Sequence, residues 1–284
     1  MSVPNIGRVG VWAMDLRFGD ATAIDAAAAE VEELGYGALW IPGGIDDAVL
    51  GDVDRLLSAT SRIVIGTGII NIWKQEAADV AAWWKGQSAE RQARVWLGIG
   101  ISHGPIIGES WMKPIAKTRE WLDQAAAAGL PADALCIAAL GPQMMALARE
   151  RTGGAHPYLV DPSHTATARG ILGAGKMLAP EQGVVLESDP ATARAMAREA
   201  VKYYTSLPNY CNNWRRLGYS EEDIATVSDH LIDGIFVWGS AAQIAARVKA
   251  HHDAGADHVC IQVISATGLD GSRAAWRELA AALL

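Results

Sequence analysis

The chain has 284 residues, of which 50% are hydrophobic and 20% charged, so it can bury a large core and is not of a disordered class. Its formal net charge of −8 and the lack of a long basic run argue against a nucleic-acid partner. The three cysteines are widely separated, and no uncharged stretch could span a bilayer, so we expect a cytoplasmic protein with reduced cysteines and no membrane contact.

Short apolar segments alternate with helical segments along the whole chain. The first helix is expected to begin at Asp20, a good N-cap residue, and to end at Gly35. Later helices are expected over 76–87, from Pro142, from Pro190, and from the capping box of Ser240 and Gln243. The predicted strands are 9–13, 38–41, 63–70, 95–99, 135–140, about 155–160, 183–186 and 258–263.

These eight strands are mostly apolar on both faces, which is typical of parallel strands covered by helices. Eight strand–helix units predict a single α/β domain over 1–284, folded as a (β/α)8 barrel. An open, doubly wound sheet is compatible with the same pattern. Residues 207–235 do not fit the repeat, and we interpret them as a helical insertion between strands seven and eight, suited to a lid or an oligomer contact.

In a parallel barrel the active site lies where the strands end. The segments at those ends hold aromatic and apolar residues but few ionisable ones. Trp12 and Trp73 are candidates to wall a flat ring. The helix that begins at Gly141-Pro142 offers free backbone N–H groups for a phosphate, with Lys74, Arg169 and Lys176 as candidate charge partners.

A serine hydrolase is an alternative function. Gly100-Ile101-Ser102-His103-Gly104 follows a strand and fits the G-x-S-x-G pattern, with Asp161 and His258 as possible triad partners of Ser102. Against it, Pro105 and Gly108 disfavour the helix that such a turn requires. The histidines His251, His252 and His258 have no metal-ligand spacing, so we expect no metal.

Five stretches carry a family resemblance: 62–71, 94–100, 139–144, 154–159 and 238–259. In them the sequence resembles the luciferase-like flavin and deazaflavin oxidoreductases, in particular their coenzyme F420-dependent branch, and the resemblance spans nearly the whole chain, from Gly10 to Val263. Each stretch is weakly specific alone, but their order and spacing together are more specific. The resemblance implies a TIM barrel, an oxidoreductase activity and a homodimer.

Residue by residue, the resemblance implies a cofactor site with a non-proline cis peptide between Gly68 and Ile69. It implies that Leu140, Gly141, Pro142 and Gln143 form the phosphate-binding turn. The other implied cofactor-binding residues are Asn71, Gly100, Ile101, Ser102, His156 and Tyr158.

The sequence departs from this family at two places. Gly43-Gly44 stands where an acid or a histidine is usual, and His103 replaces the usual glutamate after strand four. We therefore expect His103 to be the catalytic acid or base, with Asp15 as a second candidate.

The expected function is hydride transfer between coenzyme F420 and a small organic substrate. An FMN-dependent monooxygenase with the same barrel is an alternative. The two glycines also leave open a protein that binds the cofactor without catalysing a reaction.

Overall fold

The computed structural model describes residues 2–44, 46–108 and 113–284. In this part of the chain, short parallel strands form one sheet. They are β1 (Val9–Trp12), β2 (Ala38–Ile41), β3 (Val64–Thr67), β4 (Ile70–Asn71), β5 (Val95–Gly100), β6 (Leu135–Ile137), β7 (Gly154–Ala155), β8 (Met177–Leu178), β9 (Glu181–Val185), β10 (Phe236–Trp238) and β11 (Val259–Val263).

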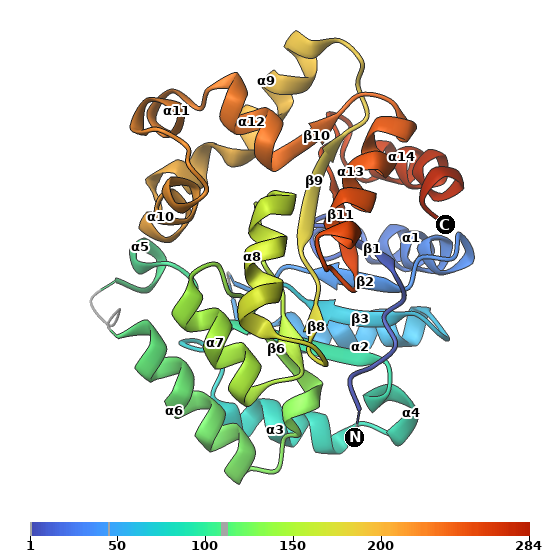
Figure 1. Cartoon of the computed structure of the whole chain (residues 1–284). Coiled ribbons are helices and arrows are strands. Elements are labelled where there is room, and N and C mark those ends of the chain that lie inside the picture. The colour runs from blue at the N-terminus through green and yellow to red at the C-terminus, as the bar shows by residue number, and fades with distance from the viewer. Residues whose placement is uncertain (1, 45, 109–112) are drawn as a thin grey trace.

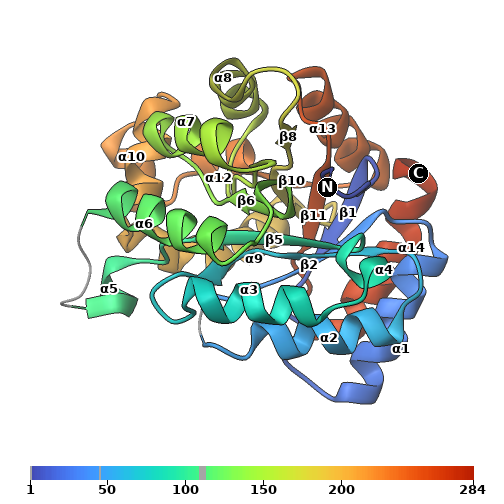
Figure 2. The same ribbon diagram turned by 90° about the horizontal axis from the view of Figure 1, so that it is seen from below.

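Helices connect the strands and surround them, as Figure 2 shows. They are α1 (Ala21–Glu33), α2 (Val49–Ala59), α3 (Ala77–Gly86), α4 (Ala89–Gln92), α5 (Gly104–Ile107), α6 (Pro114–Ala127), α7 (Pro142–Arg151), α8 (Pro162–Leu172), α9 (Pro190–Val201), α10 (Pro208–Arg216), α11 (Glu221–Thr226), α12 (Asp229–Ile235), α13 (Ala241–Asp253) and α14 (Gly268–Leu283). A 3₁₀ segment, η3 (Lys202–Ser206), links α9 to α10. None of the described helices is both long and apolar enough to cross a membrane.

The sheet closes into a barrel at the segment 177–185. Its first part, β8, pairs with β7, and its second part, β9, pairs with β11, which in turn pairs with β1. The backbone N–H of Ala179 also donates to Ala155, and that of Cys260 donates to Pro180, so pairing continues on both sides of the break. The closed parallel barrel is therefore confirmed, and the open doubly wound sheet is wrong.

Several predicted strands differ from the observed ones. The third predicted strand, 63–70, is interrupted at a cis peptide bond between Gly68 and Ile69 and becomes β3 and β4. The sixth predicted strand is only two residues long, because Pro157 has no N–H to donate and Leu159 adopts a positive φ of 54°. The sequence prediction also omits α2, α8, β8 and β10.

Helix boundaries follow local capping chemistry, as expected. The Asp20 side chain accepts a hydrogen bond from the N–H of Ala23 at the start of α1. Ser240 and Gln243 form the expected capping box of α13. These caps fix where each helix begins, and therefore which residues remain in the connecting loops.

The barrel interior is filled by large aromatic side chains. Trp12, Trp40 and Trp96 belong to one buried cluster with the free cysteines Cys136 and Cys260. Gly66 leaves room for this packing, because a β-carbon there would lie 2.6 Å from the Trp40 ring. This part of the barrel interior is therefore packed with side chains, and the larger of the two cavities described below lies towards the carboxyl ends of the strands.

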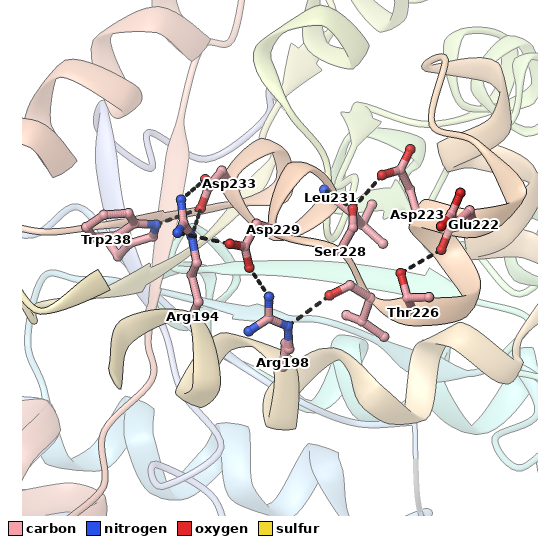
Figure 3. A network of polar contacts seen from close by, with 11 residues as sticks. Arg194, Arg198, Glu222, Asp223, Thr226, Ser228, Asp229, Leu231, Asp233 and Trp238 are labelled. Carbon is pink, nitrogen blue, oxygen red and sulfur yellow. Dashed lines mark hydrogen bonds and ion pairs between the residues drawn. The ribbon is translucent and has the colours of Figure 1, made fainter. Parts of the chain in front are cut away.

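The helices between β9 and β10 form a second layer over one end of the barrel (Figure 1). Residues 207–235 contain α10, α11 and α12, which pack with α9 around a separate apolar cluster. Ion pairs join α9 to α12: Arg194 contacts Asp229 and Asp233, and Arg198 contacts Asp229 (Figure 3). We call α9, η3, α10, α11 and α12 together the cap.

Candidate functional site

A cavity of about 390 Å³ lies between the carboxyl ends of the barrel strands and the cap. This volume falls within the range of small-molecule sites, roughly 300–1,000 Å³. The cavity is lined by Trp12, Met14, Pro42, Gly44, Gly68, Ile69, Gly100, Ile101, Ser102, His103, Ala138, Ala139, Leu140, His156, Tyr158, Tyr203, Tyr204, Asn209 and Tyr210. Nine of the fourteen residues predicted as catalytic or cofactor-binding lie in this lining, and so does Trp12, which was predicted to wall a flat ring.

The floor of the cavity is built around Gly68. A β-carbon at Gly68 would collide with Trp12 Nε1 and come within 3.0 Å of His156 Nε2. Both nitrogens are buried and have no hydrogen-bond partner within the described residues. An unpaired N–H donor and an unpaired ring nitrogen therefore converge on one point, which indicates a ligand with complementary polar groups.

His156 is held in one orientation. Its Nδ1 donates to the carbonyl oxygen of Ala179 at 2.7 Å, and its ring stacks on Trp40 with the centroids 4.3 Å apart. Burial lowers the pKa of His156 to about 4, although the bond to Ala179 opposes this shift. The ring is therefore neutral near pH 7, and Nε2 presents a lone pair towards Gly68.

His103 lines the side of the cavity, just beyond the end of β5. Its side chain hydrogen-bonds Asn209 of α10, while Nδ1 has no partner among the described residues. Burial lowers the pKa of His103, and the bond to Asn209 partly offsets that effect. His103 was predicted as the catalytic acid or base, and it reaches the cavity. The cap therefore orients its ring.

Tyrosines form a second wall of the cavity, which meets the floor where the Tyr158 ring lies 5.5 Å from that of Trp12. Tyr158 follows β7, whereas Tyr203, Tyr204 and Tyr210 belong to the cap. The centroids of Tyr204 and Tyr210 are 4.8 Å apart, and the His103 ring lies 5.6 Å from Tyr210. The Tyr158 hydroxyl donates to Gln262 Oε1 at 2.7 Å, which ties this wall to β11.

A buried acid, Glu181, lies within the barrel near these tyrosines. Burial raises the pKa of Glu181 to about 8, although one oxygen accepts a hydrogen bond from Leu159 N at 3.0 Å. The other oxygen has no partner in the described parts of the chain. Glu181 is consequently protonated near pH 7 and adds no charge to the site.

The predicted phosphate-binding turn lies beside the cavity. Leu140 lines the cavity, whereas Gly141, Pro142 and Gln143 lead away from it into α7. The guanidinium of Arg216 lies 3.6 Å from where a β-carbon of Gly141 would be. A cationic side chain of the cap thus meets the amino end of a ten-residue helix, and this combination favours an anionic group.

Two predicted site residues are placed elsewhere. Asn71 is buried outside the lining, where it donates to the carbonyl oxygen of Gly44 at 3.1 Å and accepts from Trp73 N. Asp15 lines a separate cavity of about 190 Å³ and accepts a hydrogen bond from Ser272. The structure therefore does not bring Asp15 together with His103.

Two of the three suggested charge partners, Arg169 and Lys176, are not found at the turn. Arg169 binds the backbone of Gly255 and pairs with Asp257, and Lys176 donates to Thr152. These contacts precede β11 and β7, and so they lie at the amino end of the barrel. The interpretation of Arg169 and Lys176 as charge partners of a phosphate is wrong.

Trp73, which was predicted to wall a flat ring, lies outside the cavity lining. Its Nε1 donates to Ile101 O.

The hydrolase triad is not assembled. Ser102 follows β5 at the carboxyl end of the barrel, whereas His258 precedes β11 at the amino end. His258 Nδ1 bonds Gly7 O, and its Nε2 accepts from Trp40. Asp161 instead caps α8. These positions rule out His258 as the base for Ser102.

The sequence prediction did not assign some of the lining residues to the site. Tyr203, Tyr204, Tyr210 and Asn209 come from the cap. Residues 207–235 were interpreted as an insertion suited to a lid, but none of its residues was predicted to line the cavity. Arg216 was missed for the same reason. A cluster of tyrosines within 203–210 was the only available indication.

Comparisons with known proteins agree with this fold. No protein-family model and no curated protein matches the chain in sequence. A solved F420-dependent secondary alcohol dehydrogenase, in complex with an F420-acetone adduct, is similar at a TM-score of 0.70 and 15% identity, over 100% of both chains.

Two further solved structures are similar. The coenzyme F420-dependent tetrahydromethanopterin reductase from Methanopyrus kandleri has a TM-score of 0.67 and 15% identity, over 99% of this chain and 98% of that one. The oxygenating constituent of 3,6-diketocamphane monooxygenase from Pseudomonas putida, in complex with FMN, has a TM-score of 0.67 and 14% identity, over 96% of each chain. The barrel that the resemblance predicts is therefore confirmed.

Proposed function

We propose that the chain is an oxidoreductase that binds coenzyme F420 in the cavity at the carboxyl end of the barrel and acts on a small organic substrate. When bound, this cofactor accepts or donates a hydride. The observation that carries the proposal is the floor of the cavity, where Trp12 Nε1 and His156 Nε2 are buried, have no hydrogen-bond partner among the described residues, and both lie within 3.0 Å of one point beside Gly68.

The residues present fit the ring of a deazaflavin or a flavin. The pyrimidine edge of both rings alternates carbonyl and N–H groups, which complement an unpaired donor and an unpaired acceptor side by side. The surrounding lining is apolar or aromatic, as is usual where a flat ring binds. The start of α7 and Arg216 would hold the phosphate.

His103 would hold or deliver the proton that accompanies hydride transfer. It reaches the cavity, and its bond to Asn209 fixes the ring. Its lowered pKa makes the imidazole neutral near pH 7, the form that can accept a proton. We do not assign this role to Asp15, because it lies in the separate cavity.

A cofactor titration tests the proposal. F420, FMN and riboflavin are added to the protein, and the absorbance and fluorescence of each ring are followed. We expect F420 to bind with a Kd below tens of micromolar. If neither F420 nor FMN binds at that concentration, the proposal is wrong. If FMN binds more tightly and the loaded protein consumes oxygen, the monooxygenase alternative replaces it.

The phosphate contact has a matched pair of variants. Arg216→Gln should weaken the binding of F420 and FMN about ten-fold, equivalent to about 1.4 kcal/mol, and leave riboflavin unaffected. Arg215→Gln is the control, because Arg215 pairs with Glu221 on the exposed side of the cap. If both variants weaken cofactor binding equally, Arg216 does not contact the phosphate.

A further inference from the structure

The cavity has no charged group to match a charged substrate. Within the described residues, its lining includes no aspartate, glutamate, lysine or arginine. The histidines His103 and His156 have lowered pKa values, and the neighbouring Glu181 has a raised one. All three are neutral near pH 7, so a charged ligand would lose its hydration without gaining a counter-charge.

The substrate side of the cavity is a wall of aromatic rings. Tyr204 lies with its centroid 5.6 Å from Tyr158 and 4.8 Å from Tyr210, in tilted and edge-on arrangements. His103 lies edge-on to Tyr204 at 6.5 Å. These rings come from the β7 loop, the cap and the end of β5, so the folded chain assembles one aromatic surface from three separate segments.

Two hydroxyl groups of this wall, those of Tyr158 and Tyr204, are used within the protein. Tyr158 donates to Gln262 and is hydrogen-bonded with Tyr204. Burial, followed by the influence of neighbouring tyrosines and Glu181, raises the pKa values of Tyr158 and Tyr210, so both phenols stay protonated. The wall therefore offers mainly ring surface, which prefers to pack against another ring.

From this geometry we propose that the substrate is an uncharged, flat aromatic or polycyclic ketone or alcohol. Its ring packs among Tyr158, Tyr204 and Tyr210, and its oxygen faces His103. This inference rests on the proposed function, because the cofactor ring would occupy the floor at Gly68 and leave the tyrosine wall for the substrate.

Three bicyclic compounds of similar size test the inference by calorimetry on the cofactor-loaded protein. They are 1-tetralone, which is neutral and aromatic, 1-decalone, which is neutral and saturated, and 1-naphthoate, which is aromatic and charged. We expect 1-tetralone to bind at least ten-fold more tightly than either of the others. Equal binding of 1-tetralone and 1-decalone, or tighter binding of 1-naphthoate, would overturn the inference.

Variants of Tyr204 test whether the preference for 1-tetralone arises from the wall of tyrosines. Tyr204→Leu removes the ring and should reduce the preference for 1-tetralone over 1-decalone at least five-fold, with the Kd of the cofactor unchanged. Tyr204→Phe keeps the ring and should retain the preference. If Tyr204→Leu does not fold, the ligand series on the unmodified protein still decides.

The cofactor titration is read separately from the ligand series. Binding of the cofactor without a preference for 1-tetralone refutes the substrate class and leaves the proposed function standing. Absence of cofactor binding refutes the proposed function, and the inference that rests on it falls as well.

Discussion

At the scale of single residues, Gly68 sets the shape of the cavity floor. Gly68→Ala places a methyl group against Trp12 Nε1 and His156 Nε2, so one of these side chains must move. We expect the variant to lose about 1–3 kcal/mol of unfolding free energy and to raise the Kd of the cofactor at least ten-fold. Denaturant unfolding and the cofactor titration measure the two effects.

Gly44→Ala is the matched control for this change. Gly44 also lines the cavity, but a β-carbon there meets no atom within 4 Å. We expect it to alter stability and cofactor affinity little. If both alanine variants behave alike, the floor at Gly68 is not the determinant of binding.

Glu181 gives the second prediction at this scale. Its pKa is about 8 in the folded protein and near 4.5 when unfolded, so the folded state holds an extra proton between these values. Stability from this group is present below about pH 4.5 and is lost as the pH rises towards 8. The stability of the natural protein relative to Glu181→Gln should therefore fall across that window, by at most about 1.4 kcal/mol per pH unit.

Urea unfolding of both proteins at pH 5, 6, 7 and 8 measures this difference. The buried histidines, such as His156 and His258, have lowered pKa values and shift stability in the opposite direction. Both proteins share those histidines, so their effect cancels in the comparison. Parallel stability curves would show that Glu181 is not protonated in the folded state.

The residues of the site were predictable to different degrees. The resemblance to a known family located Gly68, His103 and His156, because each follows a strand at a recognisable place. Residue patterns alone did not indicate Glu181 or Arg216. Glu181 lies inside a strand where an acid is unexpected, and Arg216 reaches the site only through the packing of the cap.

At the scale of secondary structure, a side chain joins the end of α1 to the start of β3. The Glu32 carboxylate accepts hydrogen bonds from the backbone N–H groups of Ser61, Arg62 and Ile63 at 2.6–3.1 Å. Burial alone would raise the pKa of Glu32, but these bonds outweigh it and lower the pKa to about 2. Glu32 thus fixes where the third strand begins.

Glu32→Gln should cost about 1–3 kcal/mol of unfolding free energy at pH 7, because the amide loses charged hydrogen bonds and brings an N–H group against other donors. A lowered pKa stabilises the fold above about pH 4.5, and this contribution is lost as the pH falls towards 2. The difference in unfolding free energy between the natural protein and Glu32→Gln should therefore be smaller at pH 3 than at pH 7. Glu33→Gln, at an exposed neighbouring position, is the control and should change little.

The helices and strands show why local sequence patterns predicted only part of the secondary structure. Strong N-cap residues such as Asp20 and Ser240 allowed the starts of α1 and α13 to be predicted. In contrast, β7, β8 and β10 have two or three residues each, too few for a periodic pattern. Their strand conformation depends on pairing across the barrel, which the sequence does not show locally.

At the scale of the whole molecule, the chain has more than one apolar core. The barrel and its surrounding helices share one large cluster, whereas the cap packs around its own cluster, which includes Leu207, Trp214 and Ile232. Regions with separate apolar cores can unfold locally, each with its own free energy of opening. We therefore expect backbone amides in α9 to α12 to exchange with deuterium faster than those in β1, β2 and β5.

The ion pairs of Figure 3 provide a way to test this division, because Asp233 accepts from both Arg194 and Trp238. Asp233→Asn removes the charge that Arg194 faces, and exchange in α9 and α12 should accelerate several-fold while the barrel strands keep their rates. Asp253→Asn, which breaks an exposed pair with Lys249 on α13, should leave the cap unchanged. Since the cap carries Tyr204 and Asn209, a bound ligand should slow its exchange more than that of α1. Uniform acceleration over the whole chain would mean that the barrel and the cap open together, and that the aromatic wall is as rigid as the floor.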